Sequence, residues 1–248
     1  MATEHHPLRQ IGDPILHARP TAVDFNQADS FSAYSDLLKQ EQQLSGGVGI
    51  ACNQYAAIAA PQALFWVGSD DEATRAAAAL RYPGDTIPHA TLMINPEILS
   101  YSAETYFPEH GEGCLSVAGP LRGKVRRHRS VSVRYQTMDG ATIEKECTGF
   151  EAHIIQHEYD HLQGLVFLQK ILADCSAQQI ASIRQLLQQE TERRQPPRRV
   201  PVVKSMSPIV AFERDGNAVV VDAVRLETAL TAIPDGTLQG ILRMLPRR

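Results

Sequence analysis

Two histidines and a glutamate stand close together in the stretch QHEYDHLQG, which runs from Gln156 to Gly164. Residues four apart on a helix lie on the same face, so His157 and His161 can both direct an imidazole nitrogen at one ion. Imidazole nitrogen is a ligand that Zn and Fe accept. Glu158 lies about 100° round the helix from His157, beside the metal face, where a base acting on metal-bound water belongs.

The same letters also fit a solvated helix face with two titrating histidines. With 9 histidines in 248 residues, H-E-x-x-H arises by chance in roughly a few per cent of such chains. We favour the metal site, which then needs a third ligand, because catalytic sites usually have three protein ligands and one open position. No histidine follows His161, and three downstream carboxylates do not stand at a recognisable metal-ligand spacing: Asp174, Glu190 and Glu192.

A cysteine upstream offers the missing ligand. Cys114 lies in EGCLS, 157 − 114 = 43 residues before His157, which is room for a β-hairpin that returns the chain. Thiolate sulfur is a good ligand for Zn or Fe. A lone cysteine is more often a small buried hydrophobe, but glycine-rich, polar surroundings favour the ligand here.

Composition limits the class of protein. The chain is 43% hydrophobic with a net charge of −4 and a pI of about 6.1, which allows one sizeable core with a small appended module and gives no sign of DNA binding. No apolar run approaches the roughly 20 residues of a membrane span, and the first residues lack a signal-peptide pattern. The cysteines form no C-x-x-C, which favours a reduced, cytoplasmic chain: Cys52, Cys114, Cys147 and Cys175.

Periodicity and turn residues predict an α+β fold with a separate tail. Helices are expected over 28–44, within the polar excursion 69–90, from about Glu151 through the histidine motif, and over 176–194. Strands or loops are expected over 45–54 and 63–68, and a strand running into a turn over 91–100. Asp139-Gly140 marks a hairpin over 130–147. A proline-arginine linker at 193–199 precedes a second hairpin candidate around Asp215-Gly216, which is followed by helical segments. The predicted division is 1–175, catalytic; 176–194, helix and linker; and 195–248, a small α/β extension of unknown role.

Three motifs in order, GVGIACNQ, EGCLS and QHEYDH, resemble the signature motifs of peptide deformylases. GDPILHARPTAVDF, INPEIL and LQGLVFLQKI fit as well, so the resemblance covers about residues 8–172. It implies mixed and antiparallel sheets around the central H-E-x-x-H helix. It also implies removal of the formyl group from the N-terminal methionine of new proteins, as formate. The implied substrates are N-formyl-methionyl peptides or nascent chains, and the implied cofactor is one divalent ion, Fe(II) in vivo, exchangeable for Zn, Ni or Co.

The resemblance implies a role for each residue of this chain that matches a family motif. The implied metal ligands are Cys114, His157 and His161, and Glu158 is the general base and acid. The side-chain amide of Gln54 and the backbone N–H of Leu115 are the oxyanion donors. The residues expected to bind substrate line the same motifs: Gly47, Val48, Gly49, Gly113 and His153.

The first motif departs from the family pattern. Cys52 and Asn53 stand where alanine and proline are usual, and IAAPQ, ending at Gln62, copies the familiar ending. We prefer Gln54 because Gly47 and Gly49 precede it at the expected spacing, whereas Gln62 runs directly into the next strand. Cys52 is expected to pack rather than react.

Other departures leave alternatives open. His153 lies one turn before His157, where it is either a partly exposed helix histidine, which we favour slightly, or part of the substrate pocket. A group of basic residues is expected to form a solvated surface rather than to contact ribosomal RNA: Arg122, Lys124, Arg126, Arg127, Arg129 and the tail arginines. Two other functions stay open: a metal-dependent amidase or peptidase on the same scaffold, and a non-catalytic peptide-binding protein.

Overall fold

The computed structural model describes residues 8–11, 13–82, 84–117, 122–173, 208–214 and 217–222. Its elements in chain order are η1 (Phe25–Gln27), α1 (Ala28–Ser45), β1 (Gly49–Ala51), η2 (Cys52–Gln54), β2 (Leu64–Val67), α2 (Glu72–Arg81), β3 (Thr91–Tyr101), β4 (Thr105–Tyr106), β5 (Arg127–His128), β6 (Ser130–Gln136), β7 (Thr142–Thr148), α3 (Gly149–Leu162), α4 (Phe167–Ala173), β8 (Pro208–Arg214) and β9 (Asn217–Asp222). Among the helices in these ranges, none is long and apolar enough to cross a membrane.

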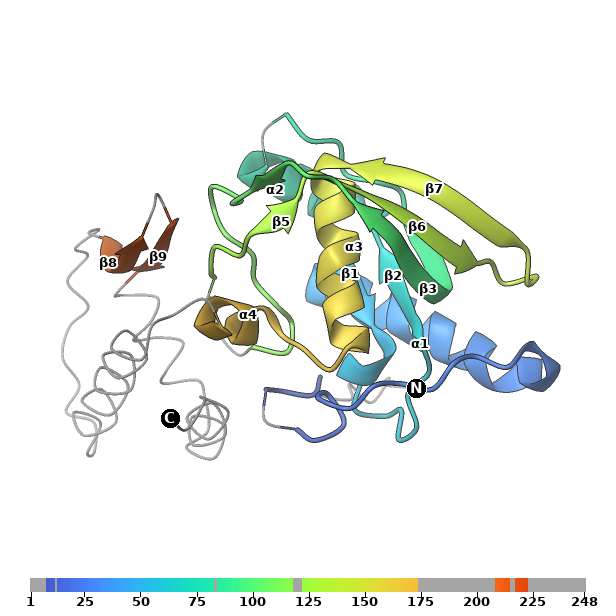
Figure 1. The fold of residues 1–248 in the computed structure, drawn as a ribbon. Coiled ribbons are helices and arrows are strands. Elements are labelled where there is room, and N and C mark those ends of the chain that lie inside the picture. The colour runs from blue at the N-terminus through green and yellow to red at the C-terminus, as the bar shows by residue number, and fades with distance from the viewer. Residues whose placement is uncertain are drawn as a thin grey trace, which may run out of the picture.

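The main sheet has five strands in the order β1-β2-β3-β6-β7, and Figure 1 shows it curving beside α3. All of its strand pairs are antiparallel. Of the expected mixed and antiparallel sheets, the main sheet is thus of the antiparallel kind. Parallel pairing in the described ranges is limited to an isolated bridge between Thr21 and Gln62. The predicted hairpin is confirmed: β6 and β7 pair from Ser130 opposite Thr148 to Gln136 opposite Thr142.

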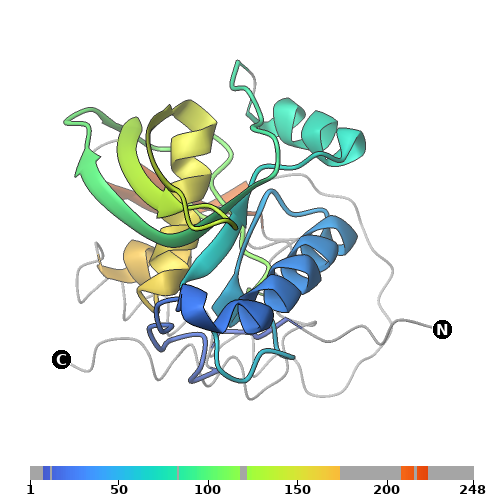
Figure 2. The ribbon, with the colours of Figure 1, turned by 90° about the vertical axis from the view of Figure 1, so that its right-hand side faces the viewer.

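Alternation along the strands produces a core on both faces of the sheet. In β2, Leu64 and Trp66 pack with α1, whereas Phe65 and Val67 pack on the other face, in the cluster that contains the apolar residues of α3. Figure 2 shows α1 and α3 on opposite sides of this part of the sheet, and both helices contact β1 and β2. β1 is thereby buried between two layers, which fixes the short segment that carries the first motif.

β3 is one long strand rather than a strand that ends in a turn. Asn95 has a φ of 47° and breaks the register with β6 between Ile94 and Glu97. Its side chain stabilises this conformation, because Oδ1 accepts from the backbone N–H of Val23 at 2.7 Å and Nδ2 donates to the Val23 carbonyl at 3.0 Å. Asparagine tolerates positive φ better than most residues, so Asn95-Pro96 makes a bulge and the strand continues.

α3 is the central helix and is buried on nearly every side. It begins at Gly149, two residues before the predicted start, and Gln156 attaches it to β5 through two 2.9 Å hydrogen bonds with the backbone of His128. It ends before Gly164, whose φ of 75° reverses the chain. A Cβ at Gly164 would lie 2.3 Å from the His17 carbonyl oxygen, so only glycine fits this close approach.

The remaining predictions have mixed outcomes. The predicted helix in the excursion is α2, while α4 was not predicted as an element. β8 and β9 form the predicted tail hairpin. The helix over 176–194, the linker at 193–199 and the last two helical segments lie outside the described residues.

Candidate metal centre and its cleft

The ligand atoms of Cys114, His157 and His161 all lie within 4.8 Å of one another. The sulfur of Cys114 is 3.2 Å from Nε2 of His161, and the two imidazole rings are 5.1 Å apart at their centroids. One sulfur and two nitrogens at such separations suit a single four-coordinate divalent ion with one open position. The residues present therefore fit the expected metal ion. The downstream carboxylates weighed as ligands, Asp174, Glu190 and Glu192, lie outside the described residues.

Cys114 is placed by a short loop that closes on itself. The backbones of Glu112 and Gly123 exchange two hydrogen bonds of 2.7 and 2.9 Å, which brings together the two ends of the segment that carries Cys114. The backbone N–H of Ser116 donates to the cysteine sulfur at 3.3 Å. This contact helps to hold the sulfur beside the ligand helix, 3.2 Å from Nε2 of His161.

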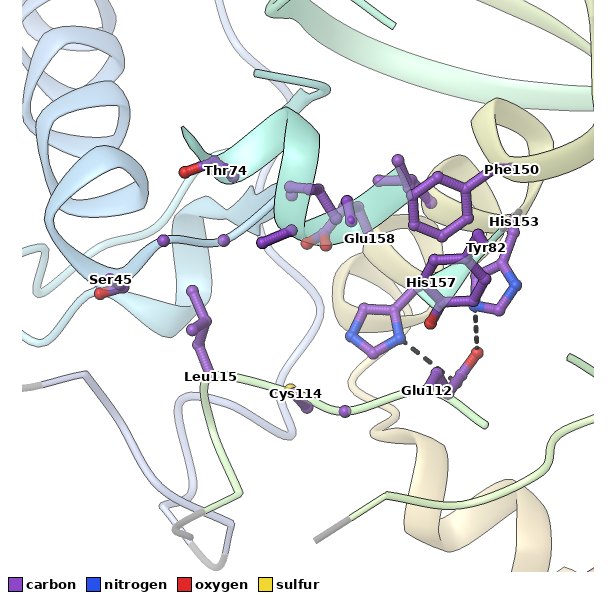
Figure 3. A pocket seen from close by; sticks show the side chains of 18 of the residues that line it. Ser45, Thr74, Tyr82, Glu112, Cys114, Leu115, Phe150, His153, His157 and Glu158 are labelled. Carbon is purple, nitrogen blue, oxygen red and sulfur yellow. Dashed lines mark hydrogen bonds and ion pairs between the residues drawn. The ribbon is translucent and has the colours of Figure 1, made fainter. Parts of the chain in front are cut away.

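A buried carboxylate orients the first histidine. Oε1 of Glu112 lies 3.2 Å from Nδ1 of His157, as the dashed line in Figure 3 marks. Burial alone would raise the pKa of Glu112, but the guanidinium of Arg127, with hydrogen bonds from His153 and His157, holds this pKa well below its ordinary value. A carboxylate can only accept, so Nδ1 of His157 carries the proton and Nε2 is left for the ion.

Arg127 is a structural residue rather than a surface one. Its side chain is 1% exposed and lies between two acids, donating to Glu112 at 2.5 and 3.0 Å and to Asp160 at 2.6 Å. The expectation that Arg127 belongs to a solvated basic surface is therefore wrong, whereas Arg126 and Arg129 are exposed. Glu112, Arg127 and Asp160 were missed as site residues. The one available signal was the acid that opens EGCLS, two residues before the cysteine.

His153 is buried, so the expectation of a partly exposed helix histidine is wrong. Its Nε2 is 2.8 Å from Glu112 and its Nδ1 is 3.3 Å from the hydroxyl of Tyr106. Its ring lies 5.9 Å from that of Tyr82 and 5.6 Å from that of Phe150. Burial lowers the pKa of His153, so a neutral imidazole forms part of the cleft wall beside two aromatic rings.

Glu158 lies at the edge of the cleft, 3% exposed. Its Oε2 has no hydrogen-bond partner within the described part of the chain. Burial raises the pKa of Glu158 to about 7, against the opposing effect of His157. A carboxylate with a pKa near neutrality can both accept and return a proton.

Gln54 reaches the centre and Gln62 does not. Oε1 of Gln54 accepts from the backbone N–H of Ala51 at 2.7 Å, which turns the amide nitrogen toward Ser116 Oγ at 3.1 Å and Cys114 Sγ at 3.6 Å. Gln54 lines the cleft. Gln62 instead takes part in the bridge to Thr21 and is not among the lining residues.

The unusual residues of the first motif have structural roles. Cys52 is fully buried in the hydrophobic cluster beside α1, which confirms that it packs, and burial raises its pKa to about 11. Asn53 donates through Nδ2 to the carbonyls of Leu16 at 3.1 Å and His161 at 2.7 Å. The asparagine thus joins the first motif to the last turn of the ligand helix.

The cleft that holds these groups has a volume of about 390 Å³. Figure 3 shows His157, Glu158 and Glu112 in it, with Tyr82, Phe150 and His153 beside them. The residues expected to bind substrate, and the second expected oxyanion donor, all line it: Gly47, Val48, Gly49, Gly113, Leu115 and His153. The cleft therefore brings the three metal-ligating side chains, the Glu158 carboxylate and the Gln54 amide around one small volume.

Comparison with known proteins agrees with this chemistry. A family model described as polypeptide deformylase matches residues 5–176. The chain is 35% identical over 171 residues to peptide deformylase 2 of Nostoc sp., covering 69% of this chain and 88% of that protein. It is 34% identical to peptide deformylase 2 of Shewanella oneidensis, covering 66% and 83%.

Solved structures give the same result. The Met-Ala-Ser-bound class I type b peptide deformylase of Acinetobacter baumannii superposes with a TM-score of 0.57 and 34% identity, over 66% of this chain and 97% of that one. The actinonin-bound form of the same enzyme gives 0.54 and 32%, over 66% and 97%.

Proposed function

The chain belongs to the peptide deformylase family, and from this membership we propose roles for its own side chains. Its activity is that of a metal-dependent hydrolase that removes the formyl group from an N-terminal methionine. The observation that carries the assignment of roles is the convergence of Cys114, His157 and His161 within 4.8 Å, with Glu158 lining the same cleft.

We propose that Cys114, His157 and His161 hold one divalent ion, Fe(II) in the cell and Zn, Ni or Co when exchanged. When bound, such an ion lowers the pKa of a water molecule and polarises a carbonyl oxygen. Glu112 supports the site by fixing the proton of His157 on Nδ1, at 3.2 Å. Partners of this kind commonly change metal affinity or activity by about 10- to 100-fold when they are removed.

Glu158 moves the protons of the reaction. It accepts a proton from the water that attacks the formyl carbon, and returns it to the methionine nitrogen as the C–N bond breaks, so formate and a free amine leave. The side-chain amide of Gln54 and the backbone N–H of Leu115 donate to the oxygen that becomes negative. One such donor can contribute about 3 to 4 kcal/mol in the transition state.

The proposed substrates are N-formyl-methionyl peptides and nascent chains, which the protein binds in the cytoplasm. The bound Met-Ala-Ser of the Acinetobacter structure supports a peptide that begins with methionine. The rings of Tyr82, Phe150 and His153 on the cleft wall support a thioether, because sulfur makes favourable contacts with aromatic rings.

The test compares formyl-Met-Ala-Ser with acetyl-Met-Ala-Ser and free Met-Ala-Ser on protein prepared without oxygen and analysed for metal. We expect formate release from the first substrate alone. Hydrolysis of the acetyl or free peptide at a similar rate would favour a broader amidase or peptidase, and tight binding without turnover would favour a peptide-binding protein. With Co(II), a thiolate charge-transfer band that survives Cys114→Ser would overturn the ligand assignment.

We further propose that residues 1–175 are the catalytic domain, that 176–194 connect it, and that 195–248 are dispensable for chemistry. Every motif precedes Leu172 in the sequence. A chain ending after Glu192 should release formate from formyl-Met-Ala-Ser at the parent rate. Any role of the tail arginines at the ribosome would then appear as weaker binding of the truncated chain to isolated ribosomes, with strong salt dependence.

A further inference from the structure

An apolar stripe on α2 faces away from the core. Ala73, Ala76, Ala77 and Leu80 follow the spacing i, i+3, i+4, i+7, which places them on one side of a helix, and all four are exposed. Leu80 is 83% exposed, the most exposed of the large apolar side chains in the described ranges. We call these four residues the α2 stripe.

The stripe is not a core face that has failed to pack, because α2 has a separate buried side. Thr74 and Ala78 are buried, and the carboxylate of Asp71 caps the helix by accepting from the backbone N–H of Thr74 at 2.7 Å. Just after the helix, the ring of Tyr82 stacks on Phe150 of α3 with 4.0 Å between centroids. α2 is therefore fixed to the body by one side while the α2 stripe faces outward.

The stripe is continuous with the catalytic cleft. Ala77 belongs to the stripe and also lines the cleft, next to Thr74 and Ala78. In the view of Figure 3, Thr74 of α2 and Ser45 at the end of α1 lie on the side of the pocket away from His157. Leu80 follows Ala77 by three residues, about 4.5 Å farther along the helix axis.

We infer that the α2 stripe extends the substrate site and binds apolar side chains of the polypeptide beyond its first three residues. The inference rests on the proposed function, because the residues that follow a formyl-methionine bound at Glu158 must extend out of the cleft. Ala77 of the stripe already lines the cleft, and an extended peptide advances about 3.3 Å per residue, so residues beyond the third can meet the stripe where the cleft borders α2. The charged residues of α2 with described side chains, Glu72 and Arg75, lie off the stripe, which favours apolar over charged segments.

Two substitutions on one helix separate this role from general effects. Leu80→Glu places a charge on the stripe, and Ala79→Glu places the same charge at an exposed position outside it. Three substrates are compared: formyl-Met-Ala-Ser, formyl-Met-Ala-Ser-Leu-Val-Leu and formyl-Met-Ala-Ser-Asn-Gly-Ser. For the parent, kcat/KM should be higher on the apolar hexapeptide than on the polar one.

Leu80→Glu should lower kcat/KM on the apolar hexapeptide by about tenfold, or about 1.4 kcal/mol, mainly through KM, because a charge replaces an apolar contact of leucine size. It should leave kcat/KM on the tripeptide unchanged, and Ala79→Glu should leave kcat/KM on all three substrates unchanged.

Equal losses in both variants would overturn the inference, as would a parent without preference between the hexapeptides. Activity on the tripeptide would in either case uphold the proposed function. A parent inactive on the tripeptide would overturn both. A parent dimer that Leu80→Glu dissociates, with unchanged kinetics, would assign the stripe to a second copy and overturn the substrate role.

Discussion

The backbone of Gly49 lies directly against the carboxylate of Glu158. A Cβ built on this glycine would come within 2.3 Å of Glu158 Oε1 and 2.9 Å of Ile154 Cγ2. β1 can approach α3 this closely only because residue 49 has no side chain. The first motif thus fixes the position of Glu158 in the third motif, the residue to which we assign the proton transfers.

Gly49→Ala should reduce kcat by about 100-fold, because an added methyl group must push the Glu158 carboxylate aside and a displacement of about 1 Å has this effect. Metal content should stay near the parent value, since none of the ligand atoms is touched. Gly47→Ala is the matched control. Its Cβ meets the flexible Leu115 side chain at 3.1 Å, so its loss should be much smaller. Equal activity of the two variants would mean that Gly49 does not position Glu158.

Glu158→Ala should keep the metal and nearly abolish hydrolysis. Glu158 follows His157 on α3 and is outside the group of ligand atoms, so the ion does not depend on it. Loss of general acid-base action costs about 10²- to 10⁴-fold, and one residue serving in both directions should lie at the upper end. Glu158→Gln should behave alike, because an amide keeps the shape but cannot take the proton. Metal analysis and turnover on the same sample decide, and a metal-loaded variant within tenfold of the parent contradicts the mechanism.

The sequence predicted the parts of the site that depend on local geometry. Two histidines four apart and a glutamate beside them need only a helix, and the order of the three motifs supplied Cys114. The hairpin of β6 and β7 was equally local, since Asp139-Gly140 determines it.

Burial and pairing across the chain were not predictable in this way. Arg127 stands in a run of basic residues, and nothing in that run shows that it lies between Glu112 and Asp160. His153 lies one turn before His157, and that spacing does not show whether the helix is solvated there, whereas α3 is enclosed on nearly every side. The bulge at Asn95 depends on the backbone of Val23, 72 residues earlier.

Gln54→Ala should lower kcat by about 100- to 1,000-fold on formyl-Met-Ala-Ser, the usual effect of losing one oxyanion donor. Its amide is aimed at the metal centre by the 2.7 Å hydrogen bond from Ala51. Gln62→Ala is the matched control, since the same change occurs at a residue that does not line the cleft, and its kcat should remain within about twofold. The reverse order of the two losses would assign the donor to Gln62.

Glu112→Gln should make the protein less stable at pH 7 by about 3 kcal/mol, because it removes one acid from a buried guanidinium. The pKa of Glu112 is depressed in the folded state, whereas in the unfolded chain it is about 4.3. Its contribution to the free energy of unfolding is therefore fully present above about pH 4.3. It is lost as the pH falls through the folded pKa.

The measurement is urea unfolding of the chelated parent and variant between pH 7 and pH 3, so that metal release does not enter. The stability difference between them should be constant at neutral pH and should shrink below about pH 4. Glu104→Gln is the control, since this acid pairs with Arg129 while 68% exposed, and such pairs contribute at most about 1 kcal/mol. A difference for Glu112→Gln that stays constant down to pH 3 would show that Glu112 titrates alike in the folded and unfolded chains. The ion pair with Arg127 would then not be what keeps this carboxylate charged beside His157.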